Sequence, residues 1–541
     1  MIQPEKTSHI WLCDLVFMVF SALYALLALE GVIAISGHGV HMDSDLATYA
    51  QAMTHALHPG FFASDPVLNS NSPAVDISNL ERLVATLLMP GDNVAVGLFR
   101  AGAVAIFIFY CGWYILGRWL FKSPALSALL SVLCGITIWI EFGTFWGINH
   151  SDPIPRVYFA AIFPLLLLFA LAAIKHAKFR PAAMFLTGLS IWVHGVSALN
   201  CGAMFFVAFA LSKPGETGPG AHMAGLALCL FSFFLPVLCF LWPSLMQARN
   251  FSQEELAVFR NLFDLRWAAD YSNSEARLLH LLTSKNACSL LALGGFFAWL
   301  LTVFKGSPRE KTLALACPAF ILAIFLVAIF CFAESRYAAN LGRLSMGHEL
   351  VRGIRFLVPL SLLMIVAAVR IILPRIVIRP GVCCVIALVA IFTVDRQYVA
   401  AQYALGQKTG IALPLAEGAK DMAENAEKRA KFLEKIVGTV PKGQAIFSED
   451  EDMAIRYIAL RPLAHAFKDG YIHFYNKDLA GSKKWLELER LLAEKPNGLI
   501  KAWLFSGAPW LLCRNTTDRK LLDEHGKIEL ELDGWLLVKK N

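Results

Sequence analysis

Residues 37–93 read GHGVHMDSDLATYAQAMTHALHPGFFASDPVLNSNSPAVDISNLERLVATLLMPGDN, a polar stretch between two apolar runs at 10–36 and 93–121. Each flanking run is long enough to cross a lipid bilayer as a helix. The stretch is acidic, and Arg82 is the single Arg or Lys within it. Cytoplasmic loops of membrane proteins collect basic residues, so we expect this loop to lie on the opposite, extracytoplasmic side.

The loop also carries the signature of two surface helices. Apolar residues recur at helical spacing across 45–57, namely Leu46, Tyr49, Ala50, Met53 and Leu57. This pattern predicts a short amphipathic helix at the membrane surface, which His58-Pro59-Gly60 ends. A second helix is predicted over 77–89, where Pro90-Gly91 stops it. Acids at the helix starts make the loop a candidate reaction or binding site.

Composition places the chain among multi-spanning membrane proteins. Its 541 residues are 57% hydrophobic, and its mean hydropathy is +0.56. These values are too apolar for a soluble protein. The net charge of +7 is not a nucleic-acid signal, because Lys and Arg lie at the ends of apolar runs and not in one patch. The first run is too long for a signal-peptide core, so we expect a retained first helix.

The 12 cysteines lie mostly inside apolar runs. There is no CxxC pair, and the adjacent Cys383-Cys384 falls in a predicted helix. We therefore interpret the cysteines as small hydrophobic residues, and we expect from them neither a disulfide framework nor a zinc site.

Loop charges set the expected topology. Apolar runs of spanning length lie at 10–36, 93–121, 124–140, 157–174, 181–211, 222–245, 288–304, 313–333, 356–374 and 377–394. Basic clusters follow several of them, at Arg118/Lys122, Lys175/Lys178/Arg180, Lys305/Arg309/Lys311 and Arg370/Arg375/Arg379. Ten simple crossings from a cytoplasmic N-terminus place the first two clusters on the cytoplasmic side and the last two on the outer side. One further crossing between Arg180 and Lys305 places all four on the cytoplasmic side, as expected for basic clusters.

We place the further crossing in the long 181–211 run, broken near His194, because broken helices are tolerated where they are buried in protein or line a wet cavity. The alternative is one long tilted helix with a non-spanning segment elsewhere. With the break, the chain has about 11 spans, a membrane domain over 1–396 and an extracytoplasmic C-terminus. We find no internal repeat that indicates a duplicated transporter.

The composition of residues 405–541 is that of a soluble domain. A charged amphipathic helix is predicted over 417–437, and short apolar strands over 444–447, 463–467 and 510–513. Helices at 451–459, 480–495 and 516–525 alternate with them. A terminal hairpin turns at Asp533-Gly534. The alternation predicts a small α/β domain.

Asp43-Ser44-Asp45 is the sharpest chemical motif, with His41 before it and Asp65 twenty residues after Asp45. Carboxylates at i and i+2 can hold a divalent cation, or one can act as a base on an incoming hydroxyl. Asp and Ser are also common helix caps, and Asp before Pro is common in turns. Spacing alone leaves both interpretations open.

The layout resembles that of GT-C superfamily membrane glycosyltransferases, whose first extracytoplasmic loop carries a modified DxD or similar acidic motif. The resemblance covers about the first seven spans in layout and Asp43 to Asp65 in residues. It is greatest to bacterial GT-C-like proteins with an extra soluble C-terminal domain, whose tail is similar to the pattern from Arg461-Pro462 to Phe467-Lys468-Asp469. The resemblance implies inverting transfer of a sugar from a polyprenyl-phosphate donor, with Asp43 or Asp45 as general base.

A lipid-phosphate donor needs cations near the outer leaflet, and an Arg fork can bind two phosphate oxygens. The candidates are Arg100, Arg156, Arg352 and Arg355. Arg100 lies inside the second span, where it can instead pair with Glu141. For Arg352 and Arg355, contact with lipid headgroups is an equally open interpretation.

His150, Asp152 and His194 lie at outward tips and are candidates for an acceptor or auxiliary site, together with His41. An intramembrane His often only hydrogen-bonds a neighbouring helix. Arg461, His465, Lys468 and Asp469 are close in sequence, and a solvated strand edge and turn is the favoured interpretation of them.

The first hypothesis is therefore a glycosyltransferase in a bacterial inner membrane, with Asp43 and/or Asp45, Asp65 and one outer-leaflet Arg lining a single catalytic cavity. Its partners are membrane lipids, a polyprenyl-phosphate sugar donor and an envelope glycan, lipid or protein acceptor; the metal requirement is open, with a divalent cation as one option. A lipid or polysaccharide transporter or flippase is the second hypothesis, and it requires a charged path through the spans. A non-catalytic envelope scaffold is the third.

Overall fold

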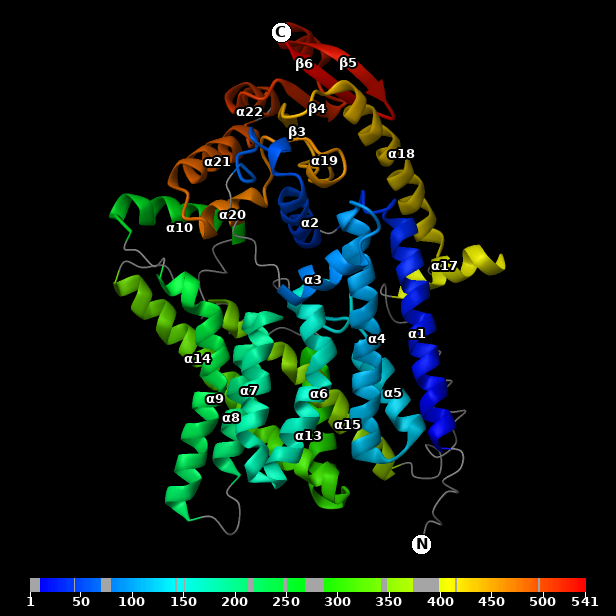
Figure 1. The fold of residues 1–541 in the computed structure, drawn as a ribbon, viewed down its shortest axis with the longest axis vertical. Coiled ribbons are helices and arrows are strands. Elements are labelled where there is room, and N and C mark those ends of the chain that lie inside the picture. The colour runs from blue at the N-terminus through cyan, green and yellow to red at the C-terminus, as the bar shows by residue number, and fades with distance from the viewer. Residues whose placement is uncertain are drawn as a thin grey trace.

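The computed structural model describes residues 10–42, 44–69, 79–141, 144–149, 151–212, 218–246, 251–267, 287–341, 348–372, 398–413, 416–494 and 497–541. Within them, long apolar helices form a bundle, and a C-terminal region with a small sheet lies on one end of it (Figure 1). Helix α1 begins at the far end of the bundle and runs up to this region.

The bundle helices are α1 (Ile10–Ile35), α4 (Val94–Phe121), α5 (Pro124–Gly135), α6 (Pro155–Lys175), α7 (Arg180–Leu189), α8 (Gly195–Leu211), α9 (Pro219–Met246), α13 (Ala287–Lys305), α14 (Pro308–Asn340) and α15 (Leu357–Ile372). Six described stretches, in α1, α4, α6, α9, α14 and η5–α15, are long and apolar enough to cross a membrane. Shorter apolar helices are α5, α8 and α13. The 377–394 run lies outside the described residues, so the expected total of about 11 spans stays a prediction.

The 181–211 run is broken, as the charge pattern predicts. Helix α7 ends at Leu189, a 3-10 turn η4 follows (Ser190–Trp192), and α8 begins at Gly195 with His194 as its N-cap. The His194 ring accepts the backbone N–H of Ser197, which satisfies one open donor of the helix start. The alternative of one long tilted helix over 181–211 is therefore wrong.

Basic residues gather at the bundle end that lies away from the C-terminal region. Arg118 occupies the last turn of α4, which runs down from that region (Figure 1), and its Nε lies 2.9 Å from Asp14 Oδ1 of α1. Arg309 of α14 donates to the Trp119 carbonyl at 2.7 Å. Arg370 of α15 pairs with Glu310. These contacts tie the ends of four helices together through basic side chains.

The first loop contains both predicted helices, α2 (Ser44–Leu57) and α3 (Asn79–Leu88), with a 3-10 turn η2 (Pro59–Phe61) between them. The apolar stripe of α2 is buried, with Leu46 and Ala50 at 0% exposure, and the helix packs on α4 and α19. The apolar face of α2 thus packs against protein, and the expectation that the helix lies at the membrane surface stays a prediction. Helix α3 does expose apolar side chains, at Leu83 and Leu87.

Two further elements of the bundle were not predicted. The segment before α6 forms an antiparallel hairpin of β1 (Ile138–Glu141) and β2 (Thr144–Trp146). A 3-10 helix, η5 (His348–Phe356), precedes α15 and packs against α8, α14 and β2. Together they surround the start of α6.

The C-terminal region comprises α17 (Val399–Thr409), α18 (Glu417–Thr439), β3 (Ile446–Ser448), α19 (Ala454–Tyr457), α20 (Asp469–Tyr475), α21 (Leu479–Leu492), α22 (Gly498–Ser506), β4 (Trp510–Arg514), α23 (Arg519–His525), β5 (Gly526–Leu532) and β6 (Trp535–Lys540). The sheet order is β3-β4-β6-β5, with β3 and β4 parallel and the other pairs antiparallel. Helix α10 (Gln253–Trp267) packs against α20 and α21.

The terminal hairpin is present, and its turn residues have the positive φ that a tight hairpin needs, 50° at Asp533 and 82° at Gly534. The predicted strand at 463–467 is reduced to one bridge between Leu463 and Ile446. Helices α20 and α22 were not predicted.

The hydrophobic core is continuous from the bundle into the C-terminal region. A single cluster of buried residues joins Leu98 of α4 to Phe432 of α18, Ile446 of β3 and Leu537 of β6. A second cluster lies around Phe447, Trp503 and Leu511. The region therefore packs directly on the bundle end that carries the first loop.

Candidate active site

Asp45 lies in the first turn of α2, one residue after the helix starts. Its carboxylate pairs with the Lys468 ammonium of the C-terminal region, and 41% of its side chain stays exposed. Tyr49 follows one turn later on the same face of α2. Asp43 lies outside the described residues, so the structure places only one acid of the DxD motif.

Arg156 stands at the start of α6, beside the beginning of α2. Its guanidinium interacts electrostatically with Asp152, Arg352, Asp45 and Tyr49. Asp152, one turn before it, places Oδ2 3.8 Å from Nη2, and the guanidinium also lies 4.1 Å from the centre of the Phe145 ring. These contacts hold the Arg156 guanidinium close enough to the Asp45 carboxylate for the two charges to interact.

Arg355 of η5 is the most buried cation of the group, with 4% of the residue exposed. It donates to Ser197 Oγ near the start of α8, and its Nη2 lies 3.5 Å from His194 Nδ1. Arg352, one turn earlier, pairs with Glu349 at 2.7 Å. Arg355 interacts electrostatically with both Arg156 and Arg352, so three guanidinium groups share one site.

A narrow crevice connects two of these cations. It is lined by Arg156, Arg355 and Ser197 on the polar side, and by aromatic rings on the apolar side, which come from Phe145, Trp146, Phe159 and Phe356. Adjacent cations repel one another in a site of low dielectric constant, so such a group favours an anion that lies between them. The lining matches an anionic head attached to an apolar chain.

Asp65 does not belong to this site. It is fully buried, and Arg456 donates to both its oxygens, Nε to Oδ2 at 2.7 Å and Nη2 to Oδ1 at 3.0 Å. The backbone N–H groups of Val67, Leu68 and Leu463 also donate to this carboxylate, each at 3.0 Å. Every acceptor direction is used, so the structure assigns Asp65 to an internal ion pair, and the catalytic prediction is corrected.

Other predicted residues are scattered. Arg100 is exposed and donates to the Leu88 carbonyl at 2.9 Å, and it is not among the groups that act on Arg156 or Arg355. His41 faces the C-terminal region and lines a larger cavity. His150 lies outside the described residues, as does the side chain of Glu141, the partner proposed for Arg100.

Sequence reasoning missed Tyr49, Ser197 and Lys468. The expected solvated edge around Lys468 is wrong, because Arg461, His465 and Asp469 are 4%, 2% and 1% exposed. A pattern of alternating apolar and polar residues cannot reveal burial that depends on the first loop, far away in sequence. The signal for Ser197 was its position three residues after His194, the spacing of a helix cap.

No protein-family profile and no curated protein matches the chain. Among solved structures it is similar to ArnT from Cupriavidus metallidurans bound to undecaprenyl phosphate, at 13% identity and a TM-score of 0.50 over 98% of each chain. The apo form of that ArnT matches with 12% identity and a TM-score of 0.48. An Archaeoglobus fulgidus oligosaccharyltransferase tethered to an acceptor peptide matches at 11% identity and a TM-score of 0.45, over 98% of this chain and 74% of that one. The chain thus shares the fold of that ArnT, and the resemblance that the layout predicted is confirmed at the level of the fold.

Proposed function

We propose that the chain is a membrane glycosyltransferase that moves a sugar from a polyprenyl-phosphate-linked donor to an acceptor, with inversion and with Asp45 as general base. The observation that supports the proposal is that Arg156 interacts electrostatically with Asp45, and Arg355 with Arg156. The fold supports it, since an ArnT of the same fold was crystallised with undecaprenyl phosphate.

Arg156 and Arg355 would bind the donor phosphate, and Arg352 would add to the positive field. The aromatic wall of the crevice suits the first isoprene units of the lipid, which are apolar. The free volume in the crevice is only about 10 Å³, so the phosphate enters by displacing side chains. Asp152 and His194 act as positioning residues, because they contact Arg156 and Arg355 respectively.

In the reaction, the acceptor oxygen attacks the anomeric carbon and its proton passes to the Asp45 carboxylate. The bond between the anomeric carbon and the phosphate oxygen breaks, and the electron pair leaves with the phosphate. The guanidinium groups stabilise the charge that develops there. The ion pair with Lys468 orients the Asp45 carboxylate, and the exposed part of the carboxylate admits the acceptor.

The acceptor would enter from a cavity of about 760 Å³ between the first loop and the C-terminal region. His41, Met42 and Ala47, which flank Asp45 in the sequence, line it. Charged and amide side chains of α18 line the opposite wall, among them Asn425 and Lys428. Such a volume lies in the usual range for ligand sites, and the polar wall suits a hydroxyl-rich acceptor of the envelope.

The basic residues at the helix ends indicate which side of the membrane the proposed active site faces. Cytoplasmic ends of membrane helices collect Lys and Arg, and Arg118, Arg309 and Arg370 lie at the bundle end away from the first loop. The arginines at the other end belong to the proposed donor site. We infer that the first loop and the C-terminal region face the extracytoplasmic side of a bacterial inner membrane. In the described spans, ionisable residues lie near helix ends, an arrangement that does not favour a transport path.

The test is Asp45→Asn in membranes that contain the full-length protein, with transfer of a labelled sugar from a polyprenyl-phosphate donor as the readout. Loss of a general base lowers the rate by about 10²–10⁴-fold, so we expect a fall of that size. Asp43→Asn, assayed in parallel, decides which acid of the motif acts as base.

Asp92→Asn is the matched control, because Asp92 belongs to the same loop and 76% of its side chain is exposed. It should transfer sugar at the wild-type rate. Full activity of both Asp43→Asn and Asp45→Asn, at normal protein levels, would remove the catalytic assignment.

A further inference from the structure

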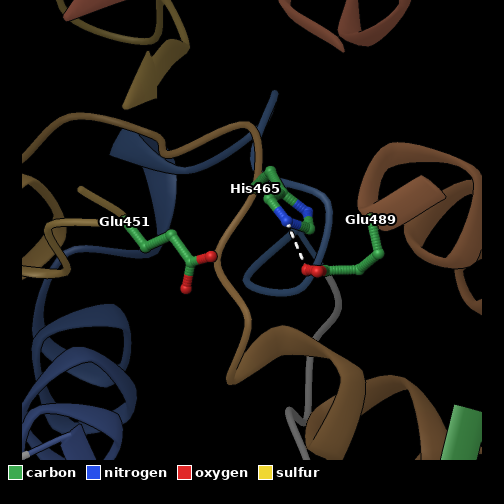
Figure 2. A group of neighbouring side chains, drawn as sticks. All are labelled: Glu451, His465 and Glu489. Atoms are coloured by element: carbon green, nitrogen blue, oxygen red, sulfur yellow. Dashed lines mark hydrogen bonds and ion pairs between the residues drawn. The ribbon is translucent and has the colours of Figure 1, made fainter. Parts of the chain in front are cut away.

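Three potential metal ligands meet in the C-terminal region, and one of them, Glu451, also lines the cavity proposed for the acceptor. Glu451 follows β3, His465 lies after the Leu463 bridge, and Glu489 belongs to α21; Figure 2 shows the two carboxylates on either side of the imidazole. One ligand atom from each residue lies within 4.8 Å of the others. His465 Nε2 is 2.8 Å from Glu489 Oε1. Donors from three separate segments thus converge on one point.

The imidazole of His465 is held by its surroundings. The residue is 2% exposed, and its ring is stacked on Phe447 with centroids 6.0 Å apart and packs against Trp485 at 6.2 Å. The Glu489 side chain is 15% exposed. A buried imidazole with a fixed ring plane is a typical metal ligand, because little side-chain entropy remains to be lost on binding.

The charge of the cluster is unbalanced. Glu451 Oε2 accepts the Phe467 backbone N–H at 2.7 Å, and His465 lies between the Glu451 and Glu489 carboxylates (Figure 2). The cluster thus brings two carboxylates to one imidazole.

The backbone at Glu451 points to a constrained position. Its φ is 51°, in the left-handed region that residues other than glycine rarely adopt. Such a conformation persists where the surrounding structure requires it, often at a ligand site. Here it directs the carboxylate toward His465 (Figure 2).

We propose that Glu451, His465 and Glu489 bind a divalent metal ion, and that Zn²⁺ is the ion the site prefers. One imidazole and two carboxylates are ligands that zinc accepts, with water at a fourth position. Tetrahedral coordination places ligand atoms roughly 3.4 Å apart, so small side-chain rotations suffice. The sequence did not predict this site, because the expectation concerned cysteine ligands.

The site links α21 to the segment 463–469, which also carries Lys468, the partner of Asp45. Metal binding itself does not depend on the proposed function. Only its consequence does: a bound ion would hold Lys468 in place beside the base.

The test measures metal content, so failure of the glycosyltransferase proposal does not affect it. Full-length protein in detergent is stripped with a chelator and titrated with Zn²⁺, and then with Co²⁺ as a spectroscopic probe. We expect one equivalent of zinc per chain and a visible Co²⁺ absorption typical of four-coordinate geometry. Glu451→Gln and Glu489→Gln, which keep the side-chain shape, should each weaken zinc binding by about 10–100-fold or more.

Asp478→Asn is the matched control, because Asp478 pairs with His473 in the same region at 3.0 Å, without a third ligand, and Asn also caps helices. It should bind zinc as the wild type does. Equal zinc binding by wild type and Glu451→Gln would overturn the proposal, as would folded wild-type protein that retains no zinc at micromolar concentrations.

Discussion

Asp45 and Asp65 belong to the same loop and the same residue type, and their surroundings separate their roles. Asp65 accepts hydrogen bonds from Arg456 and from three backbone N–H groups while fully buried. Asp45 pairs with Lys468, and 41% of its side chain is exposed. A buried carboxylate with every acceptor position filled supports structure, whereas a carboxylate that is partly exposed can receive a proton from an incoming group.

The two aspartates should therefore respond differently to the same substitution. Asp65→Asn removes one of the two buried carboxylates that accept from Arg456 and turns an amide N–H toward buried donors, so it should lower the free energy of unfolding by about 1–3 kcal/mol, with Asp469 still paired to Arg456. Asp45→Asn removes a partly exposed ion pair and should cost less than about 1 kcal/mol. Thermal unfolding of the purified variants measures both. Equal destabilisation would contradict the division of roles.

Glu451 gives a pH dependence with a defined sign. Its pKa is raised by burial, so the folded protein holds this proton more tightly than the unfolded chain. Ionisation of the carboxyl group therefore lowers the free energy of unfolding of the metal-free protein at pH values above the pKa of Glu451 in the folded state. This loss disappears when the pH falls below the pKa that the group has in the unfolded chain. Glu451→Gln removes the loss.

We thus expect metal-free Glu451→Gln to melt at a higher temperature than metal-free wild type at neutral pH. The difference should shrink as the pH is lowered through the titration of the carboxyl group. Melting curves of both proteins across that range, in chelator, measure it. A variant that is less stable than wild type at every pH would contradict the raised pKa.

At the scale of elements, the donor site depends on how η5 packs on α8. The Asn200 side chain donates to the Leu350 carbonyl of η5 at 3.0 Å and to Val196 of its own helix at 2.9 Å. Gly353 lies against the same amide, and a Cβ there would come within 1.9 Å of Asn200 Oδ1. Because glycine has no side chain, η5 can pack close enough to α8 at this point for Arg355 to donate to Ser197.

Gly353→Ala should therefore weaken donor binding without touching a charged group. Overpacking of a tight contact costs about 1–3 kcal/mol, and the added methyl moves η5 away from α8. We expect a lower melting temperature and a higher KM for the lipid donor. Gly418→Ala is a suitable control, because Gly418 is a helical residue of α18 with open space around it. Equal donor KM in Gly353→Ala and wild type would contradict the role of this contact.

The elements themselves were largely predictable from local patterns. Apolar runs and loop charges predicted the long helices and the break at His194, and the Asp533-Gly534 turn predicted the last hairpin. The burial of α2 and of the segment around His465 was not predictable, because each is covered by chain from the other half of the sequence. Asp65 was misassigned for the same reason: its partner Arg456 lies 391 positions away.

At the scale of the whole molecule, the basic residues that end several spans lie at the opposite end of the bundle from the Asp45 site. Arg118, Arg309 and Arg370 make their contacts at one end, while the Asp45 site lies at the other, under the C-terminal region. The continuous core explains how that region holds Lys468 against the first loop. Loop charges predicted that the basic clusters and the first loop lie on opposite sides of the membrane. They did not predict the direct contact between Lys468 and the first loop.

The most direct test of the central claim is the binding of undecaprenyl phosphate to the purified full-length protein. We predict that Arg156→Gln and Arg355→Gln each weaken binding by about 10-fold or more, since a charge-assisted hydrogen bond contributes about 1.5–3 kcal/mol. Arg100→Gln, outside the crevice, should bind as the wild type does. If both crevice variants bound the lipid phosphate as tightly as wild type and Arg100→Gln, the account would be contradicted.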